Sequence, residues 1–96
     1  MIELRKTPEF ERWLLKLRDN EAEARINFRL NLLADGHAGD HKPVGEGVFE
    51  LRIHCGPGYR VYFKRQGSTY VIILAGGDKN SQQKDIQLAL RLARSI

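Results

Sequence analysis

The sequence predicts a single α+β domain over residues 1–96, with an N-terminal strand and a helical hairpin packed on a mainly antiparallel sheet, and a C-terminal helix. Three observations predict this class. Residues 48–64 alternate apolar and polar side chains with the period of two that strands show. Residues 8–35 carry apolar side chains at helical spacing. An apolar segment at 69–75 precedes another helical stripe.

The first third of the chain predicts a short strand at Ile2–Arg5 and two helices. Thr7 is placed to cap the first helix, and Asp19-Asn20 ends that helix and caps the second. We expect the second helix to end at Asp35-Gly36, since glycine suits the residue that follows a helix. The stripes expected to face the sheet are Phe10, Trp13, Leu14 and Leu17, then Ala22, Ile26, Leu30 and Leu33, widened by Phe28 and Leu32.

The middle of the chain predicts an irregular loop at 37–47, rich in glycine and histidine, and then a β-hairpin. Pro57 between two glycines forms its turn. If the apolar rows share one face, Arg52 lies opposite Arg60, which is unfavourable unless an anion or a carboxylate lies between them. Either this face is simply solvated, with Glu50 and water relieving the repulsion, or it binds a polyanion beside further polar side chains. Those side chains are His54, Tyr62 and Lys64.

The last third predicts an interior strand and a helix. Residues 69–75 are apolar on both faces. A two-residue turn at Gln66-Gly67 would place Ile72 and Leu74 on the core face of Phe63. The glycine loop at 76–80 leads into a last helix that Asn80 or Ser81 caps and that carries an apolar stripe from Ile86 to Ala93. Unpaired N–H groups at the start of this helix suit a phosphate, and the loop would bring Lys79 near Arg60.

Composition narrows the function classes. Residues 1–45 carry eight Lys/Arg and eight Asp/Glu, so the surplus of +4 lies in the second half. Such an asymmetric basic excess is typical of a binder of nucleic acid or acidic protein. A single cysteine allows no internal disulfide, which favours the cytoplasm, and no apolar run approaches the ~20 residues of a membrane helix. The three histidines and Cys55 lack a zinc-like spacing, so no metal is expected.

Two segments carry a family resemblance. VFELRIHCGPGYRVYF and ILAGGDKNSQQKDIQLA closely resemble the phage-derived, HigB-like "addiction module killer" branch of the RelE/ParE toxin superfamily, and the likeness covers essentially the whole chain. It implies a RelE/ParE-like fold and a type II toxin. Many members cleave mRNA in the ribosomal A site without metal or other cofactor. Family members pair with a helix-turn-helix antitoxin encoded beside them, and operator DNA is bound only through that complex.

The resemblance also implies site positions. By motif they are Arg52 of ELR, Arg60 of GYR and Lys79 of GGDK, with Tyr62 and His54 as neighbours. In RelE-type toxins the general base is a lysine or tyrosine whose position varies among branches, so the base stays open here. We expect three further basic residues to contact RNA, namely Lys64, Arg65 and Lys84.

The implied reaction is attack of a ribose 2′-hydroxyl on the adjacent phosphate, giving a 2′,3′-cyclic phosphate and a 5′-hydroxyl. It needs a base, an acid and cations for the charge that grows on phosphorus. Guanidinium groups suit the phosphate, and the imidazole of His54 can exchange a proton near neutral pH. Two alternatives stay open, because a fold does not fix a function. One is a ParE-like gyrase poison without nuclease activity, and the other an inactive basic module that only binds its antitoxin.

Overall fold

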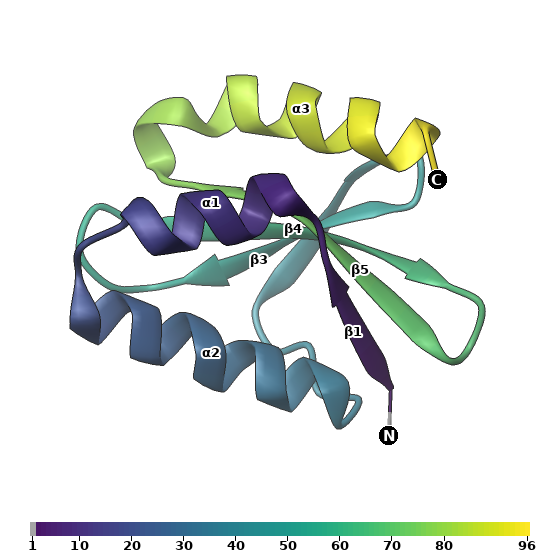
Figure 1. Cartoon of the computed structure of the whole chain (residues 1–96), viewed down its shortest axis with the longest axis horizontal. Helices are drawn as coiled ribbons and strands as arrows, with labels where there is room; N and C mark the ends of the chain where they lie inside the picture. The colour runs from purple at the N-terminus through teal and green to yellow at the C-terminus, as the bar shows by residue number, and fades with distance from the viewer. Residues whose placement is uncertain (1) are drawn as a thin grey trace.

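The structure, a computed structural model that describes residues 2–96, is a five-stranded sheet with helices on both faces (Figure 1). The elements follow in the order β1 (Glu3–Lys6), α1 (Pro8–Lys16), α2 (Asn20–Ala34), β2 (His41–Gly45), β3 (Val48–Ile53), β4 (Tyr59–Gln66), β5 (Tyr70–Gly77), the 3-10 turn η1 (Lys79–Ser81) and α3 (Gln82–Arg94). The sheet order is β1-β5-β4-β3-β2. Only β1 runs parallel to its neighbour, so the predicted α+β class with a mainly antiparallel sheet is confirmed.

The helical hairpin begins and ends where the sequence predicts. The Thr7 hydroxyl accepts a hydrogen bond from the Phe10 N–H at 3.0 Å, which caps α1. The Asp19 carboxylate accepts one from the Ala22 N–H at 3.0 Å, which caps α2. Both helices therefore start at side chains that supply partners for otherwise unpaired amides.

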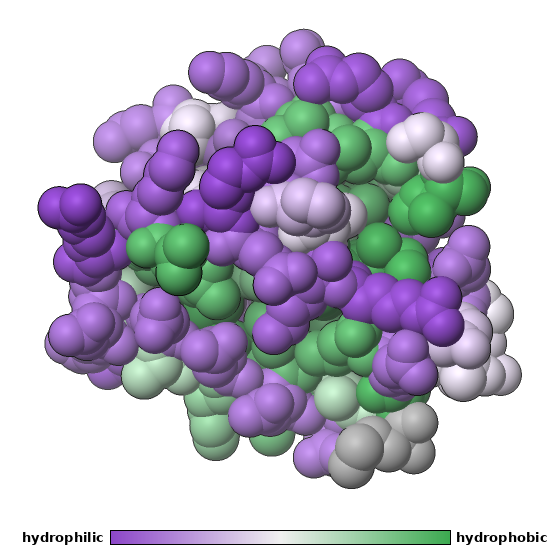
Figure 2. All heavy atoms as spheres, in the orientation of Figure 1, coloured by the Kyte–Doolittle hydropathy of each residue, from purple (hydrophilic) through white to green (hydrophobic). Residues whose placement is uncertain are grey.

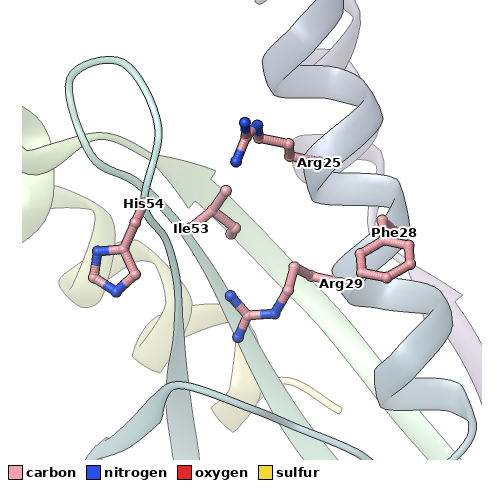
Figure 3. Close-up of a pocket in the computed structure, with 5 residues that line it drawn as sticks. All are labelled: Arg25, Phe28, Arg29, Ile53 and His54. Carbon is pink, nitrogen blue, oxygen red and sulfur yellow. The ribbon is translucent and has the colours of Figure 1, made fainter.

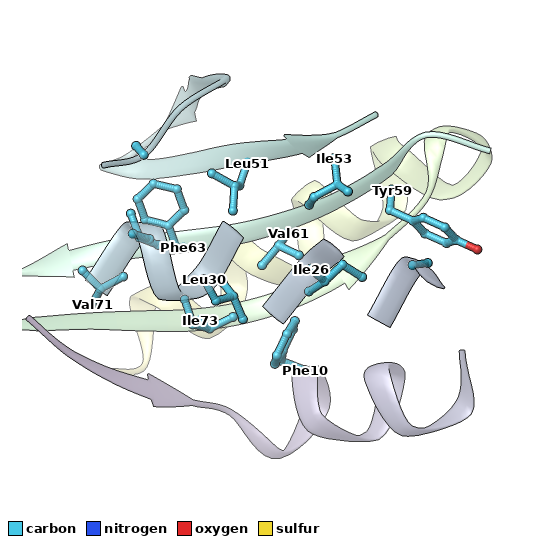
Figure 4. Close-up of a cluster of buried hydrophobic side chains, with 13 residues drawn as sticks. Phe10, Ile26, Leu30, Leu51, Ile53, Tyr59, Val61, Phe63, Val71 and Ile73 are labelled. Carbon is cyan, nitrogen blue, oxygen red and sulfur yellow. The ribbon is translucent and has the colours of Figure 1, made fainter. Parts of the chain in front are cut away.

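Two apolar clusters hold the layers together. The larger one joins α1 and α2 to one face of the sheet, through side chains such as Phe10, Ile26, Leu51 and Phe63 (Figure 4). The smaller one joins α3 to the opposite face, through Ala89 and its neighbours. Hydrophilic side chains cover most of the face seen in Figure 2, with small hydrophobic areas between them. Among residues 2–96, no helix combines the length and the apolar character that crossing a membrane requires.

Three expectations about the fold are wrong. The segment predicted to be a loop contains β2, an edge strand that pairs with β3. Ile73, not Ile72 or Leu74, lies opposite Phe63 and shares its cluster, because residues 67–69 form the turn and the β4–β5 register shifts between Tyr62 and Phe63. Phe28 does not widen the core stripe of α2, since it is 62% exposed.

The glycines at the end of β5 allow two close contacts. A Cβ on Gly76 would lie 2.3 Å from Cε3 of Trp13, and a Cβ on Gly77 would lie 1.7 Å from Oδ2 of Asp85. Both distances are far below van der Waals contact, so a side chain at either position would displace α1 or α3. Gly76 and Gly77 are thus required by helix packing, and they belong to the strand, not to a free loop.

Replacing Gly76 by alanine should lower the free energy of unfolding by about 1–3 kcal/mol or more, because the added methyl group overlaps the Trp13 ring. Thermal unfolding of the purified protein measures this loss. Gly67→Asn is the matched control: it lies in open space at φ +66°, a conformation that asparagine tolerates. Equal melting temperatures for Gly76→Ala and the wild type would contradict the close packing.

Candidate functional site

The arginine pair, Arg52 and Arg60, lies on the face of the sheet toward α3. The two residues are directly opposite in the antiparallel β3–β4 ladder, as the hairpin pattern predicts. The side chain of Arg52 is 33% exposed and that of Arg60 is 16% exposed. Two cations are thus held side by side at a partly covered position.

Glu50 lies between the two arginines and is completely buried. Its Oε1 accepts a hydrogen bond from Nε of Arg52 at 3.4 Å and lies 3.5 Å from Nε of Arg60. Its Oε2 accepts hydrogen bonds from the Tyr62 hydroxyl at 3.1 Å and from the Gln82 amide at 2.8 Å. The sequence predicts only that Glu50 relieves the repulsion between Arg52 and Arg60, but in the structure this carboxylate contacts residues of β3, β4 and α3.

Burial of this face corrects one expectation. The sequence predicted an open polar surface, but Tyr62 is as fully buried as Glu50, because the sheet face is covered by α3. Burial, followed by the nearby Glu50 carboxylate, raises the pKa of Tyr62 far above its usual value. The phenol therefore stays protonated as a hydrogen-bond donor. In this arrangement Tyr62 cannot stack on a base, and it is poorly suited to relaying a proton.

Lys79 lies across the hairpin turn from Arg60. A Cβ added to Gly58 would lie 3.5 Å from Nη1 of Arg60 and 3.8 Å from Cβ of Lys79, so both side chains flank this glycine. The Gly58 carbonyl also accepts a hydrogen bond from Nη1 of Arg60 at 2.9 Å. The side chain of Lys79 is exposed in η1. The structure thus places the base of the Lys79 side chain near Arg60.

The turn that carries Lys79 differs from the predicted phosphate loop. The amides of Asn80 and Ser81 donate hydrogen bonds to the Asp78 carboxylate at 2.8 and 3.2 Å. Asp78 is the capping residue of η1, and Ser81, one of the two predicted caps of the last helix, is the N-cap residue of α3, where its side chain makes no capping hydrogen bond. Since the Asp78 carboxylate takes these N–H groups, they are not free for an external phosphate. The cationic side chain of Lys79 remains for that role.

His54 lies at the end of β3 beside Asp40. Its Nε2 is hydrogen-bonded to the Asp40 carboxylate, a contact that lowers the pKa of Asp40 against the opposing effect of burial. The charges of Arg52 and Arg29 lower it further. Arg29 also holds this corner together, since its guanidinium donates hydrogen bonds to backbone carbonyls of Ala38, Asp40 and Arg52. A histidine–carboxylate pair therefore borders the arginine pair.

A pocket of about 270 Å³ opens between α2 and the end of β3, and His54 is one of the residues that line it (Figure 3). Arg25, Phe28 and Arg29 extend into it from α2, and Ile53 and His54 line it from the end of β3. Arg25 is engaged by Glu21 at 3.3 Å. Most of the lining surface is apolar, and the pocket lies apart from the Glu50 contacts.

The three residues predicted to contact RNA do not join this cluster. Lys64 lies four residues along β4 from Arg60, roughly 13 Å away. Arg65 lies over the rings of Phe49 and Phe63 at 5.3 and 5.5 Å from their centroids. Lys84 is exposed in the first turn of α3. Any RNA contact by these residues would therefore lie outside the group of Arg52, Arg60 and Lys79.

Comparison with known proteins yields a family and two relatives. The sequence profile of the phage-derived Gp49-like proteins matches residues 12–94. An uncharacterized protein of Haemophilus influenzae is 48% identical over 95 residues, which cover 99% of this chain and 96% of that protein. A chain in the crystal structure of the RelBE2 toxin–antitoxin complex from Mycobacterium tuberculosis is similar with a TM-score of 0.63 and 26% identity. That similarity covers 81% of this chain and 98% of the other.

Proposed function

This chain belongs to the family of phage-derived Gp49-like proteins and is a RelE-like toxin of a toxin–antitoxin system, and from this premise we propose that it is a ribosome-dependent mRNA endonuclease. The observation that carries the proposal is the arginine pair, which shares one buried carboxylate and has Lys79 beside it. Three cations against one carboxylate suit a phosphodiester, which needs more positive charge as the reaction proceeds. The site of action would be the cytoplasm, where ribosomes and mRNA meet.

The proposed reaction breaks the bond between phosphorus and the 5′-oxygen. The 2′-hydroxyl attacks phosphorus and loses its proton to a base, while the departing 5′-oxygen gains a proton. Arg52 and Arg60 hold the non-bridging oxygens, and Lys79 stabilises the charge of the phosphorane. We assign to His54 the role of the group that exchanges a proton with the substrate. Its ring is oriented by Asp40, whereas Tyr62 is buried and protonated. The ribosome would supply the geometry of the substrate.

The partner we propose is a cognate helix-turn-helix antitoxin that neutralises the toxin. The structural relative comes from a toxin–antitoxin complex, which supports a partner of this class. We expect operator DNA to be bound only through the complex with the antitoxin, as the family resemblance implies. The basic excess of the toxin complements both RNA and an acidic antitoxin segment.

Replacing Lys79 by alanine should reduce cleavage by about 100-fold and leave the fold intact, because its exposed side chain supplies charge to the transition state and little to packing. The measurement is the mapping of RNA 5′ ends after induced expression, together with thermal unfolding of the purified variant. Lys6→Ala is the matched control, since Lys6 is also exposed but lies on the edge strand β1. Full toxicity of Lys79→Ala would remove Lys79 from the site.

The same experiment with the wild-type protein separates the alternative functions. Discrete cuts within translated codons support the nuclease. Intact transcripts with a DNA damage response would support a gyrase poison instead. Normal growth on induction would support a module that only binds its antitoxin. Each result is tied to a different target, so one induction experiment decides among the three.

A further inference from the structure

We propose that Glu50 is a positioning residue that orients the arginine pair for the phosphate, an inference that rests on the proposed nuclease function. A buried carboxylate is costly unless partners compensate its charge. Glu50 has four such partners, two at each carboxylate oxygen, at 2.8 to 3.5 Å. A carboxylate bound at both oxygens cannot rotate, so the groups that contact it are fixed as well.

The nitrogen through which each arginine contacts Glu50 decides which of its N–H groups are left to bind substrate. Both arginines contact Glu50 through Nε, so their Nη groups are not the atoms that pair with this carboxylate. Nη1 of Arg60 is engaged by the Gly58 carbonyl at 2.9 Å. Within residues 2–96, the buried Nε of Arg60 makes no hydrogen bond, which leaves its contact with Glu50 purely ionic. The charge of Glu50 therefore holds Arg60 in place.

Glu50 also connects the arginine pair to Lys79. Gln82, which donates to Oε2 of Glu50, is the first residue of α3. It directly follows η1, the turn that begins with Lys79. The same carboxylate thus fixes the two strands that carry the arginines and the start of the helix that follows the lysine. Residues that orient a site in this way typically change activity about 10–100-fold when they are replaced.

The variant Glu50→Gln tests the charge with little change in shape. The amide oxygen can still face the arginines, while its NH₂ group meets two partners that can adapt, since the Tyr62 hydroxyl can accept and the Gln82 amide can flip. We expect single-turnover cleavage on programmed ribosomes to fall about 10–100-fold at saturating toxin. The toxin concentration at half-saturation should change less than about threefold, because ribosome binding does not depend on this buried group.

The wild type and Lys6→Ala provide the controls. If neither cleaves, the proposed function is wrong, whatever Glu50 does. If both cleave and Glu50→Gln cleaves at the wild-type rate, the positioning role is wrong and the nuclease proposal stands. If Glu50→Gln does not fold, Tyr62→Phe decides, since it deletes only one hydroxyl that fixes Oε2. A wild-type rate in folded Tyr62→Phe would then overturn the inference, and a loss of about threefold or more would support it.

Discussion

Arg52→Ala toxin will fail to arrest growth when it is induced without antitoxin, and its melting temperature will fall less than that of Arg60→Ala. The Arg52 side chain is 33% exposed, so its removal opens no large cavity. Glu50 retains three of its partners in this variant, namely Arg60, Tyr62 and Gln82. The missing guanidinium removes a phosphate contact that strengthens in the transition state, which costs roughly 10²–10³-fold in cleavage.

Arg60→Ala will also fail to arrest growth, and its stability will fall further. The Arg60 side chain is 16% exposed, and it contacts Glu50 as well as the Gly58 carbonyl. Removing one partner of a buried charge pair costs about 3–5 kcal/mol of unfolding free energy. We expect a smaller loss for Arg60→Ala, because Arg52 still pairs with Glu50 in this variant. Growth curves, mapped RNA 5′ ends and thermal unfolding measure both effects.

The control for both arginine variants is Arg12→Ala, at an exposed position on α1. It should arrest growth as the wild type does. Growth arrest by folded Arg52→Ala would show that the phosphate is not held by the arginine pair. An unchanged melting temperature of Arg60→Ala would show instead that Glu50 does not depend on Arg60.

The register of the arginine pair could be predicted because it depends only on alternation and on a short turn. Apolar rows on β3 and β4 must share a face, and this requirement fixes Arg52 opposite Arg60. The role of Glu50 could not be predicted in the same way, since it depends on α3 covering the polar face. One signal was present: β5 is apolar on both faces, which requires cover on both sides of the sheet.

The sequence did not predict β2 or the faces of β5, because neither segment has an alternation of apolar and polar residues that would mark it. β2 contains Pro43 and ends at Gly45, and its side chains are mostly exposed, so neither alternation nor strand propensity marks it. The face assignment of β5 failed for a related reason. A segment that is apolar on both faces fits either register, and only the turn length and the shift near Tyr62 choose between them. Such choices are made by tertiary packing.

Leu51→Ala will lower the free energy of unfolding by about 2–5 kcal/mol, because it deletes a completely buried side chain from the larger apolar cluster. For a domain of 96 residues this corresponds to a fall in melting temperature of roughly 10–30 °C. Phe28→Ala is the control: Phe28 was predicted to join the same core but is 62% exposed, so its replacement should change stability by at most about 0.5 kcal/mol.

Leu51 and Arg52 are neighbours in β3 but point to opposite faces of the sheet, so their replacement should separate stability from activity. Leu51→Ala, assayed well below its melting temperature, should cleave RNA at nearly the wild-type rate, because Glu50 and the arginine pair keep their contacts on the face toward α3. Arg52→Ala should show the reverse, a folded protein that does not cleave. A loss of cleavage in folded Leu51→Ala would mean that the two faces of the sheet are coupled. The strand β3 would then shift when its buried side chain is shortened.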